Sequence, residues 1–490
     1  MRRVQSQSQK RHRRSPTWFW RSQVVNRMGQ IQRMHFVGIG GVGMSGIAEV
    51  LLNQGYHISG SDLKESPATD RLADLGAQIF IGHDAAHIEQ AEVVVVSSAI
   101  DLENPEVACA LNARIPVIPR AQMLAELMRF KQGIAVSGTH GKTTTTSLAA
   151  AVLAEAGLDP TYIIGGKLNQ ADRNAKLGDS QYMVAEADES DASFLVLKPV
   201  MAVVTNIDAD HMGTYGGDFE RLKQTFVQFL QNLPFYGVIF ANADDPTVMD
   251  ILPKAGRAFV TFGIDASADY RAVQIETEGL KTSFTVQRAG KSPLAVELAM
   301  PGRHNVLNAL AVIALADHLG ADDSSVCRAL AEFKGVGRRF QWVGSLERGD
   351  DQIPVIDDYG HHPKELSVTF EAIRSAYPGR RLISVFQPHR YSRTEDLFDE
   401  FVSVLTTADE LILLPVYAAG ETPVLGAESK DLAMTIRRLS QCHPVVEKEF
   451  QSAIARICDI ATPNDVILIQ GAGSIGRLPQ MLLETCGRLS

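Results

Sequence analysis

Short apolar runs alternate with longer amphipathic stretches along most of this chain of 490 residues. The alternation starts with a predicted strand at 34–39, a helix at 44–53 and another strand at 93–97. A helix at 121–130 then leads into further apolar runs at 133–136, 182–185 and 201–205. Strands that alternate with helices are typical of a parallel sheet covered by helices, so the pattern predicts an α/β fold.

The alternation divides into units because the chain is too long for a single core. Residues 115–119, with two prolines, close the first unit, and the Gly- and Arg-rich residues 335–339 precede the last one. Residues 258–298, within the middle unit, are more strand-like and less regular. We therefore expect a central ATPase domain with a mainly parallel sheet between two doubly wound, Rossmann-like domains. The predicted bounds are 34–130, 131–335 and 336–490.

The first 33 residues differ from the rest in charge. They carry nine Lys or Arg and no acid, so subtracting nine from the net charge of −10 leaves −19 on residues 34–490. A basic tail can bind nucleic acid or an anionic membrane. We instead expect 1–33 to be a disordered extension, and the acidic body disfavours nucleic acid as the main partner.

Cysteine usage and hydropathy constrain the compartment. The five cysteines are scattered, and no pair has metal-ligand spacing. We therefore expect a reduced, cytoplasmic protein without structural disulfides. No apolar run approaches the ~20 residues of a membrane span, and no secretory signal is recognisable at the start.

A phosphate-binding loop is the most informative motif. Residues 137–146 read Ser-Gly-Thr-His-Gly-Lys-Thr-Thr-Thr-Thr and follow the apolar run at 133–136. Backbone N–H groups of such a turn face an anion, and the following helix adds partial positive charge. Lys142 would reach the outer phosphates and the Thr143 hydroxyl would hold Mg²⁺. The first glycine lies only three residues before Gly141, which departs from the standard spacing, but the motif still indicates ATP or GTP chemistry.

Two glycine-rich turns match the dinucleotide fingerprint. Residues 38–43 follow a strand and open a helix, and Asp62 lies where an acid would meet a ribose hydroxyl. This turn could hold the diphosphate of NAD or of a UDP-sugar. Residues 471–476 form a second copy with only 14 residues after it, so we interpret it as a packing turn.

Acidic, histidine and arginine residues follow several predicted strands. Glu186 is a candidate Mg²⁺ ligand beside the phosphate loop, and His211 follows the next strand as a second candidate. Asn305 could either read a purine edge or cap its helix. In the third unit, segments 357–363 and 386–393 lie at carboxyl ends of strands, where ligands bind in open sheets. Arg390 and Arg393 there can bind a carboxylate or phosphate.

Together these segments resemble the Mur ligase family. The resemblance runs from about Met34 to the C-terminus, and within the family it is strongest to members that join L-alanine to UDP-N-acetylmuramate. The Gly-x-x-Gly-Lys-Thr variant is this family's usual form. The matching segments are VGIGGVGMSGIAE at 37–49, SGSD at 59–62, SGTHGKTTTT at 137–146, AEADESDASF at 185–194, TNIDADHMGTY at 205–215, PGRHNVLN at 301–308, DDYGHHP at 357–363 and FQPHRYSR at 386–393.

The resemblance implies an ATP-dependent amide synthesis through an acyl phosphate, with Mg²⁺, or Mn²⁺ as a substitute. It implies catalytic roles for Lys142, Glu186, His211 and His361, of which Glu186 and His211 join Thr143 as metal ligands. It implies ATP contacts by Gly138, Thr139, His140, Gly141, Lys142, Thr143, Thr144, Asn305 and Arg339. It implies contacts with UDP-N-acetylmuramate or L-alanine by Gly38, Gly40, Gly41, Gly43, Asp62, Ser97, Asp358, Tyr359, His361, Arg390 and Arg393.

Three alternatives remain open from sequence alone. A related ligase attaches a murein tripeptide to the same UDP-sugar and would share the phosphate loop. An NAD-dependent oxidoreductase would explain the turn at 38–43 but would leave Lys142, Thr143 and Glu186 without a function. A nucleotide-controlled binding protein would use the basic tail. The sequence is also compatible with a homodimer.

Overall fold

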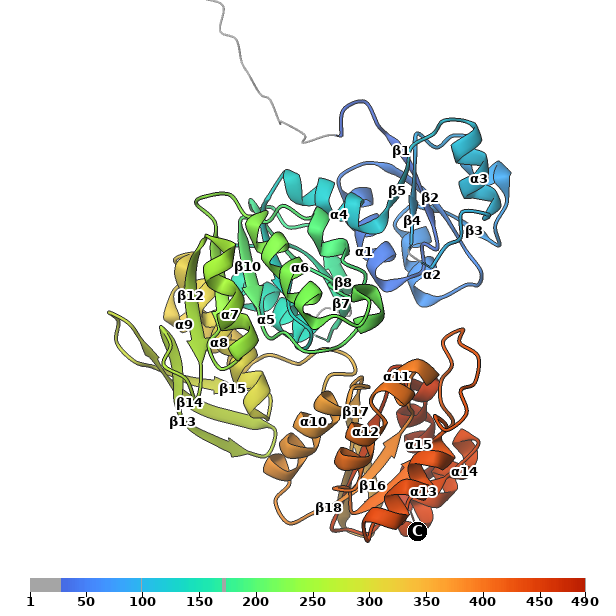
Figure 1. Ribbon diagram of the computed structural model, residues 1–490, viewed down its shortest axis with the longest axis vertical. Helices are drawn as coiled ribbons and strands as arrows, with labels where there is room; N and C mark the ends of the chain where they lie inside the picture. The colour runs from blue at the N-terminus through green and yellow to red at the C-terminus, as the bar shows by residue number, and fades with distance from the viewer. Residues whose placement is uncertain (1–27, 98, 170–172, 490) are drawn as a thin grey trace, which may run out of the picture.

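The computed structural model describes residues 28–97, 99–169 and 173–489, which form three lobes, each built on its own sheet (Figure 1). Most of the predicted basic extension, residues 1–27, lies outside the described residues. The α/β expectation is confirmed, because parallel strand pairs and covering helices dominate all three lobes.

The first lobe is a five-stranded parallel sheet in the order β3-β2-β1-β4-β5. The chain winds outward from β1 in both directions, which is the doubly wound arrangement expected for this lobe. Its strands are β1 (Arg33–Val37), β2 (His57–Asp62), β3 (Gln78–Ile81), β4 (Val93–Val96) and β5 (Val117–Pro119). Its helices are α1 (Val42–Asn53), α2 (Pro67–Asp74), the 3₁₀ helix η1 (Ala85–Ile88), α3 (Pro105–Asn112) and α4 (Arg120–Arg129).

The second lobe holds a ten-stranded sheet in the order β15-β14-β13-β12-β11-β10-β6-β9-β7-β8. Strands β6, β7 and β9 to β12 run parallel to their neighbours in this sheet, apart from the antiparallel pairing of β7 with β8. The stretch at 258–298, predicted only to be strand-like, contains β12 to β15, of which β13, β14 and β15 pair antiparallel with one another. Its strands are β6 (Gln132–Ser137), β7 (Thr161–Leu168), β8 (Arg173–Lys176), β9 (Tyr182–Glu186), β10 (Met201–Val204), β11 (Val238–Asn242), β12 (Ala258–Gly263), β13 (Tyr270–Glu278), β14 (Lys281–Arg288) and β15 (Leu294–Leu298). Its helices are α5 (Lys142–Glu155), η2 (Ser193–Val196), η3 (Met212–Tyr215), α6 (Phe219–Gln231), α7 (Pro246–Ala255), α8 (Arg303–His318) and α9 (Asp323–Ala331).

The third lobe is a seven-stranded sheet in the order β20-β19-β18-β21-β17-β16-β22, in which β16 runs antiparallel to β17. Its strands are β16 (Gln341–Arg348), β17 (Asp351–Asp358), β18 (Arg381–Phe386), β19 (Glu410–Leu413), β20 (Val445–Val446), β21 (Asp465–Gln470) and β22 (Arg488–Leu489). Its helices are α10 (Pro363–Ala376), α11 (Tyr391–Asp396), α12 (Phe398–Leu405), α13 (Ser429–Leu439), α14 (Phe450–Ile460), η4 (Ser474–Arg477) and α15 (Leu478–Cys486).

One hydrophobic core joins the first two lobes. Helix α1 lies against the β7–β8 hairpin, where Gly46 approaches the side chains of Ile163 and Ala175, and a Cβ on this glycine would come within 3.3 Å of both. Buried residues from both lobes belong to the same apolar cluster. The third lobe instead packs on two apolar clusters of its own, on opposite faces of its sheet. The first two lobes therefore share a hydrophobic core, whereas the third lobe has separate cores of its own.

The expectation of a chain without disulfides is wrong for the described residues. Cys458 on α14 and Cys486 on α15 form a disulfide with their Cα atoms 6.6 Å apart. The two cysteines are 28 residues apart in sequence, and only the side-by-side packing of their helices brings them together. Cys109, Cys327 and Cys442 are free.

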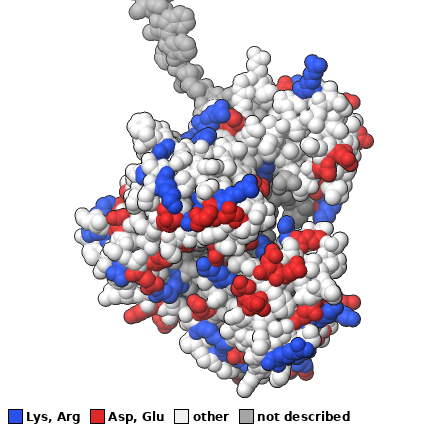
Figure 2. Space-filling model, in the orientation of Figure 1, with Lys and Arg blue, Asp and Glu red and all other residues white. Residues whose placement is uncertain are grey.

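Charge is mixed over the surface in view. Lys and Arg side chains lie scattered among Asp and Glu on the face in Figure 2 rather than gathered into one basic surface. Among the helices of the described ranges, none combines the length and the apolar character that crossing a membrane requires.

Candidate active site

The predicted phosphate loop connects β6 to α5, and two of its positions must be glycine because there is no room for a Cβ atom. Gly138 has φ +127°, and a Cβ there would collide with the Thr205 hydroxyl. Gly141, at φ +85°, is the N-cap of α5, and a Cβ there would lie 2.7 Å from Asn308 Oδ1. A neighbouring segment fixes the loop, because Asn206 Oδ1 accepts the His140 N–H at 2.8 Å. The helix N-terminus is thus held open toward an anion.

Lys142 folds back over this loop. Its Nζ donates to Gly138 O at 2.8 Å, to Thr139 O at 3.2 Å, and to both carboxylate oxygens of Glu189 at 2.8 Å. Burial alone would lower the pKa of Lys142, but the Glu189 carboxylate outweighs burial and raises it. A fixed ammonium group therefore lies where bound phosphates would need a positive charge.

The structure brings two of the three predicted metal ligands together. Thr143 Oγ1 donates to Glu186 Oε2 at 3.3 Å, and Glu186 also accepts the Gly165 N–H at 2.6 Å. Burial raises the pKa of Glu186, and a cation beside it would lower that pKa again. A hydroxyl and a carboxylate are the hard oxygen donors that Mg²⁺ prefers, so this pair fits the ion.

His211, the third predicted ligand, lies on the loop after β10. Its backbone is left-handed at φ +56°, and its Nε2 lies 3.5 Å from Asp210 Oδ2. Burial lowers the pKa of His211, with Arg393 and Lys142 acting in the same direction. A neutral imidazole keeps the lone pair that metal ligation requires. Its closest contact in this structure is nevertheless with Asp210 rather than with Thr143 or Glu186.

A cavity of about 350 Å³ lies between the second and third lobes. Predicted ATP-binding residues line it, including His140, Gly141, Thr144, Asn305 and Arg339. Sequence reasoning missed several other lining residues, because they are isolated apolar or amide side chains with no motif of their own. These residues include Asn242, Phe262 and Met300.

Asn305 and Asn308 are held by the chain itself. Asn305 Nδ2 donates to Pro301 O at 2.8 Å, and Asn308 Nδ2 donates to Asn305 Oδ1 at 3.3 Å. Both are buried and line the cavity. Purine recognition by Asn305 therefore stays a prediction. To contact a purine, its amide would have to bind the base in addition to, or in place of, its hydrogen bonds with Pro301 and Asn308.

In the third lobe, the predicted substrate residues fall into two groups. The Asp358 carboxylate accepts hydrogen bonds from the chain, including Phe340 N–H at 2.9 Å and Gln470 Nε2 at 2.7 Å, so it braces the loop after β17. The Tyr359 ring packs between two guanidinium groups, Arg338 at 5.1 Å and Arg339 at 5.0 Å from its centroid. These contacts fix the position of the following His361.

His361 and the two arginines lie toward the second lobe. His361 Nδ1 lies 3.2 Å from Tyr359 O, and burial lowers its pKa. Arg393 is mostly buried and its Nη2 contacts Asp210 Oδ1, on the second lobe, at 3.4 Å. Arg390 is half-exposed and lies 4.0 Å from Glu421. Only Arg393 therefore touches the second lobe directly.

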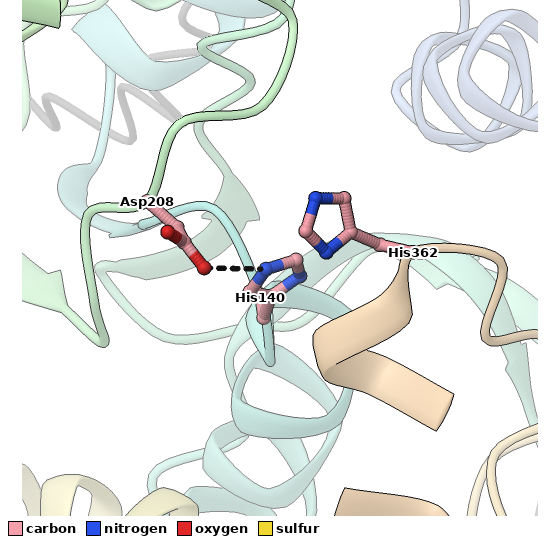
Figure 3. A group of neighbouring side chains, drawn as sticks. All are labelled: His140, Asp208 and His362. Atoms are coloured by element: carbon pink, nitrogen blue, oxygen red, sulfur yellow. Dashed lines mark ion pairs between the residues drawn. The ribbon is translucent and has the colours of Figure 1, made fainter. Parts of the chain in front are cut away.

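His140 joins the two lobes through charged contacts that sequence reasoning missed. Its Nε2 lies 3.6 Å from Asp208 Oδ2, and its Nδ1 lies 3.4 Å from Glu365 Oε1, on α10 (Figure 3 shows the Asp208 contact). Burial would lower the pKa of His140, but the two carboxylates outweigh it and raise the pKa to about 9. Lys364 completes the cluster, with Nζ 2.9 Å from Asp208 Oδ2.

The glycine turn of the first lobe, residues 38–43, is braced by Asp62. Gly38 has φ +80°, and the Gly40 N–H donates to Asp62 Oδ2 at 2.9 Å. Gly41 is the N-cap of α1, and Ser97 lies close to Gly38. Ribose binding by Asp62 stays a prediction, since the structure shows this acid holding the turn. Arg120, which sequence reasoning missed, reaches over Gly43, where a Cβ would lie 2.9 Å from its Nη1.

A buried carboxylate lies behind this turn. Glu106 is fully buried and accepts from Ser61 Oγ at 2.6 Å, and its oxygens lie 3.0 Å from His83 Nδ1 and 2.6 Å from His87 Nδ1. Burial would raise the pKa of Glu106, but its contacts with His35, Ser61 and His87 outweigh burial and lower it to about 2.

Glu106→Gln should destabilise the protein in a pH-dependent way. Because the pKa of Glu106 is about 2 in the folded protein and 4.5 for an ordinary glutamate, the stabilisation is present above pH 4.5 and is lost as pH falls toward 2. The shift corresponds to about 3 kcal/mol at pH 7. Urea unfolding of both proteins between pH 7 and pH 3 measures the difference, which should shrink on acidification. A difference independent of pH would contradict the charged state of Glu106.

Together these features define a class: a three-lobed α/β protein with a nucleotide-type phosphate loop in its central lobe and a cavity between that lobe and the third. Family models match all three lobes: "Mur ligase family, catalytic domain" at 33–132, "Mur ligase middle domain" at 136–316 and "Mur ligase, glutamate ligase domain" at 338–473. The chain belongs to the Mur ligase family.

Individual relatives agree with this assignment. A UDP-N-acetylmuramate–L-alanine ligase of Methylococcus capsulatus is 56% identical over 460 residues, covering 94% of this chain and 98% of that protein. The crystal structure of a UDP-N-acetylmuramate–alanine ligase from Thermotoga maritima superposes with a TM-score of 0.77 at 30% identity, covering 92% of this chain and 98% of that one. A murein peptide ligase from Psychrobacter arcticus superposes with a TM-score of 0.67 at 26% identity, covering 93% and 99%.

Proposed function

We propose that this protein joins L-alanine to the carboxylate of UDP-N-acetylmuramate at the expense of ATP, giving ADP and phosphate in peptidoglycan precursor synthesis. The observation that carries the proposal is the cavity that phosphate-loop residues and third-lobe residues line together, with Thr143, which follows the loop on α5, bonded to Glu186. This arrangement occurs in a chain that is 56% identical to a ligase of that activity.

The chemistry explains why three lobes are needed. A carboxylate is a poor acylating agent, so phosphorylation by ATP must first give it a leaving group, and the alanine amine then displaces phosphate. The reactants are anionic, so positioning and charge neutralisation should dominate catalysis. Lys142 supplies a fixed positive charge at the phosphate loop, and Arg393 brings another from the third lobe.

Thr143 and Glu186 are the residues that would hold Mg²⁺, or Mn²⁺ in its place, with His211 as a further ligand. The ion would neutralise phosphate charge during transfer. Because the Glu186 carboxylate is buried, its negative charge is costly until a cation lies beside it. Glu186 should therefore bind the metal–nucleotide complex more tightly than the nucleotide alone.

The outer lobes would hold the other reactants. The turn at 38–43 presents the N-terminus of α1 to a diphosphate, with Arg120 beside it, which suits the UDP part of the sugar. Tyr359, His361, Arg390 and Arg393 would bind alanine from the third lobe. Since ATP and nucleotide sugars are made in the cytoplasm, we place the reaction there.

ADP formation with each substrate omitted in turn tests the proposal. We expect ATP turnover only when UDP-N-acetylmuramate and L-alanine are both present, apart from a single turnover without the amino acid. Replacing L-alanine by the murein tripeptide tests the second candidate, which the superposition with a murein peptide ligase motivates. Turnover with the tripeptide and none with alanine would overturn the proposal.

A further inference from the structure

A second histidine, His362, lies beside the phosphate loop and has no role in the assignments above. It is only 7% exposed and is the N-cap of α10, where its Nδ1 accepts the Lys364 N–H at 3.3 Å. Glu365 completes this capping box by accepting the backbone N–H of His362 at 3.2 Å. The cap fixes the orientation of the ring.

The cap also fixes where the proton lies. Because Nδ1 accepts a hydrogen bond, the neutral ring carries its hydrogen on Nε2. That atom is buried and has no hydrogen-bond partner among the described residues. Burial, followed by the positive charge of His140, lowers the pKa of His362 to about 4, so the ring is neutral near pH 7. A buried donor left without a partner is destabilising, so its placement is best explained by an acceptor that arrives with a ligand.

His362 faces the loop that holds phosphate. Its ring centroid lies 5.1 Å from that of His140, and Figure 3 shows the two rings together beside Asp208. The negative groups around His362 are Asp208, Asp210 and Glu365. Each already has a cationic partner, respectively Lys364, Arg393 and His140.

A metal ion is a weaker explanation for this cluster, although ligand atoms of His140, Asp208 and His362 lie within 4.8 Å of one another. Both ring nitrogens of His140 face carboxylates, and the raised pKa keeps that ring protonated. The lone pair of His362 is on Nδ1, which the cap of α10 occupies. Neither ring therefore offers a free lone pair, and the cluster instead presents N–H groups to an anion.

We propose that His362 Nε2–H donates a hydrogen bond to a non-bridging oxygen of the phosphoryl group that passes from ATP to the muramate carboxylate. The inference rests on the proposed function. In that step a carboxylate oxygen forms a bond to the γ-phosphorus, the bond from phosphorus to the β–γ bridging oxygen breaks, and ADP leaves with the electron pair. His362 keeps its proton throughout. Because His362 belongs to the third lobe, this donor is in place only while that lobe contacts the phosphate loop.

Two substitutions separate the donor from the cap. The amide oxygen of His362→Asn can take over from Nδ1 as the cap acceptor, but the side chain is too short to replace the Nε2 donor. His362→Gln can place an N–H near the Nε2 position but caps less well. His443→Asn, at an exposed histidine of the same lobe, is the matched control. The measurements are kcat and KM for ATP in ADP formation, and the thermal unfolding midpoint.

We expect His362→Asn to keep the unfolding midpoint and the KM for ATP while kcat falls about 10- to 100-fold. His362→Gln should retain more of kcat despite a lower midpoint, and His443→Asn should match the unmodified protein. If kcat were unchanged in His362→Asn, whether or not KM rose, the inference about His362 would be overturned while the proposed function still stood. Absence of ADP formation by the unmodified protein with UDP-N-acetylmuramate and L-alanine would instead overturn the proposed function, and the inference with it.

Discussion

Lys142→Ala should reduce ADP formation at least about 100-fold while leaving UDP-sugar binding nearly intact. The Lys142 ammonium lies over the phosphate loop in the second lobe, whereas the turn at 38–43 belongs to the first. Removing the ammonium therefore withdraws charge from the transferring group without touching the sugar nucleotide. Steady-state ADP formation and calorimetric titration with UDP-N-acetylmuramate measure the two effects, with exposed Lys254→Ala as the control.

The buried partner of Lys142 requires a second variant. Glu189 is 1% exposed, and burial raises its pKa to about 7 even beside the ammonium, so without Lys142 we expect a buried acid that is neutral near pH 7 and charged only at higher pH. Lys142→Ala combined with Glu189→Gln keeps this position neutral at every pH, so it should restore the unfolding midpoint above pH 7 without restoring activity. Simultaneous loss of UDP-sugar binding in a folded variant would refute the assigned division of labour between the lobes.

Glu186→Gln should lower kcat about 100-fold at millimolar Mg²⁺ and raise the Mg²⁺ concentration needed for half-maximal activity at least tenfold. The amide oxygen can still accept the Gly165 N–H, and the Thr143 hydroxyl can rotate to accept from the new amide N–H, so the fold should be preserved. Loss of a buried charge should even raise the unfolding midpoint slightly. Activity measured across a Mg²⁺ series is the assay.

Asp191→Asn is the matched control for this substitution, because Asp191 is an exposed acid on the same loop. It should leave the Mg²⁺ dependence unchanged. If Glu186→Gln had the same Mg²⁺ dependence as Asp191→Asn, Glu186 would not be a ligand of the ion.

Local motifs explain why much of the site was predictable. The phosphate loop requires glycine at two positions where φ is positive and a Cβ would clash with neighbouring atoms. Gly138 and Gly141 therefore make the loop recognisable in the sequence. The apolar run before it and the following threonines give the strand and helix that position Lys142. Glu186 was predictable because it ends β9, which pairs with β6 beside the loop.

Contacts between lobes were not predictable in the same way. Glu365 reaches His140 only because α10 lies against the phosphate loop, and their sequence separation of more than 200 residues gives no sign of it. The Cys458–Cys486 disulfide was missed for a similar reason, since it depends on how α14 and α15 pack. Substrate contact by Asp358 and Asp62 stays a prediction, and their second task, bracing loops, could be found only from their hydrogen-bond partners.

The apolar cluster shared by the first two lobes has a mechanical consequence. With α1 seated on the β7–β8 hairpin, the turn at 38–43 and the phosphate loop share one packed core, so we expect their separation to stay constant. The third lobe has apolar clusters of its own, so we expect any relative movement to occur between it and the other two lobes, at the connecting residues 332–340. In the proposed reaction, the partner that binds the third lobe would then be the one whose binding is coupled to that movement.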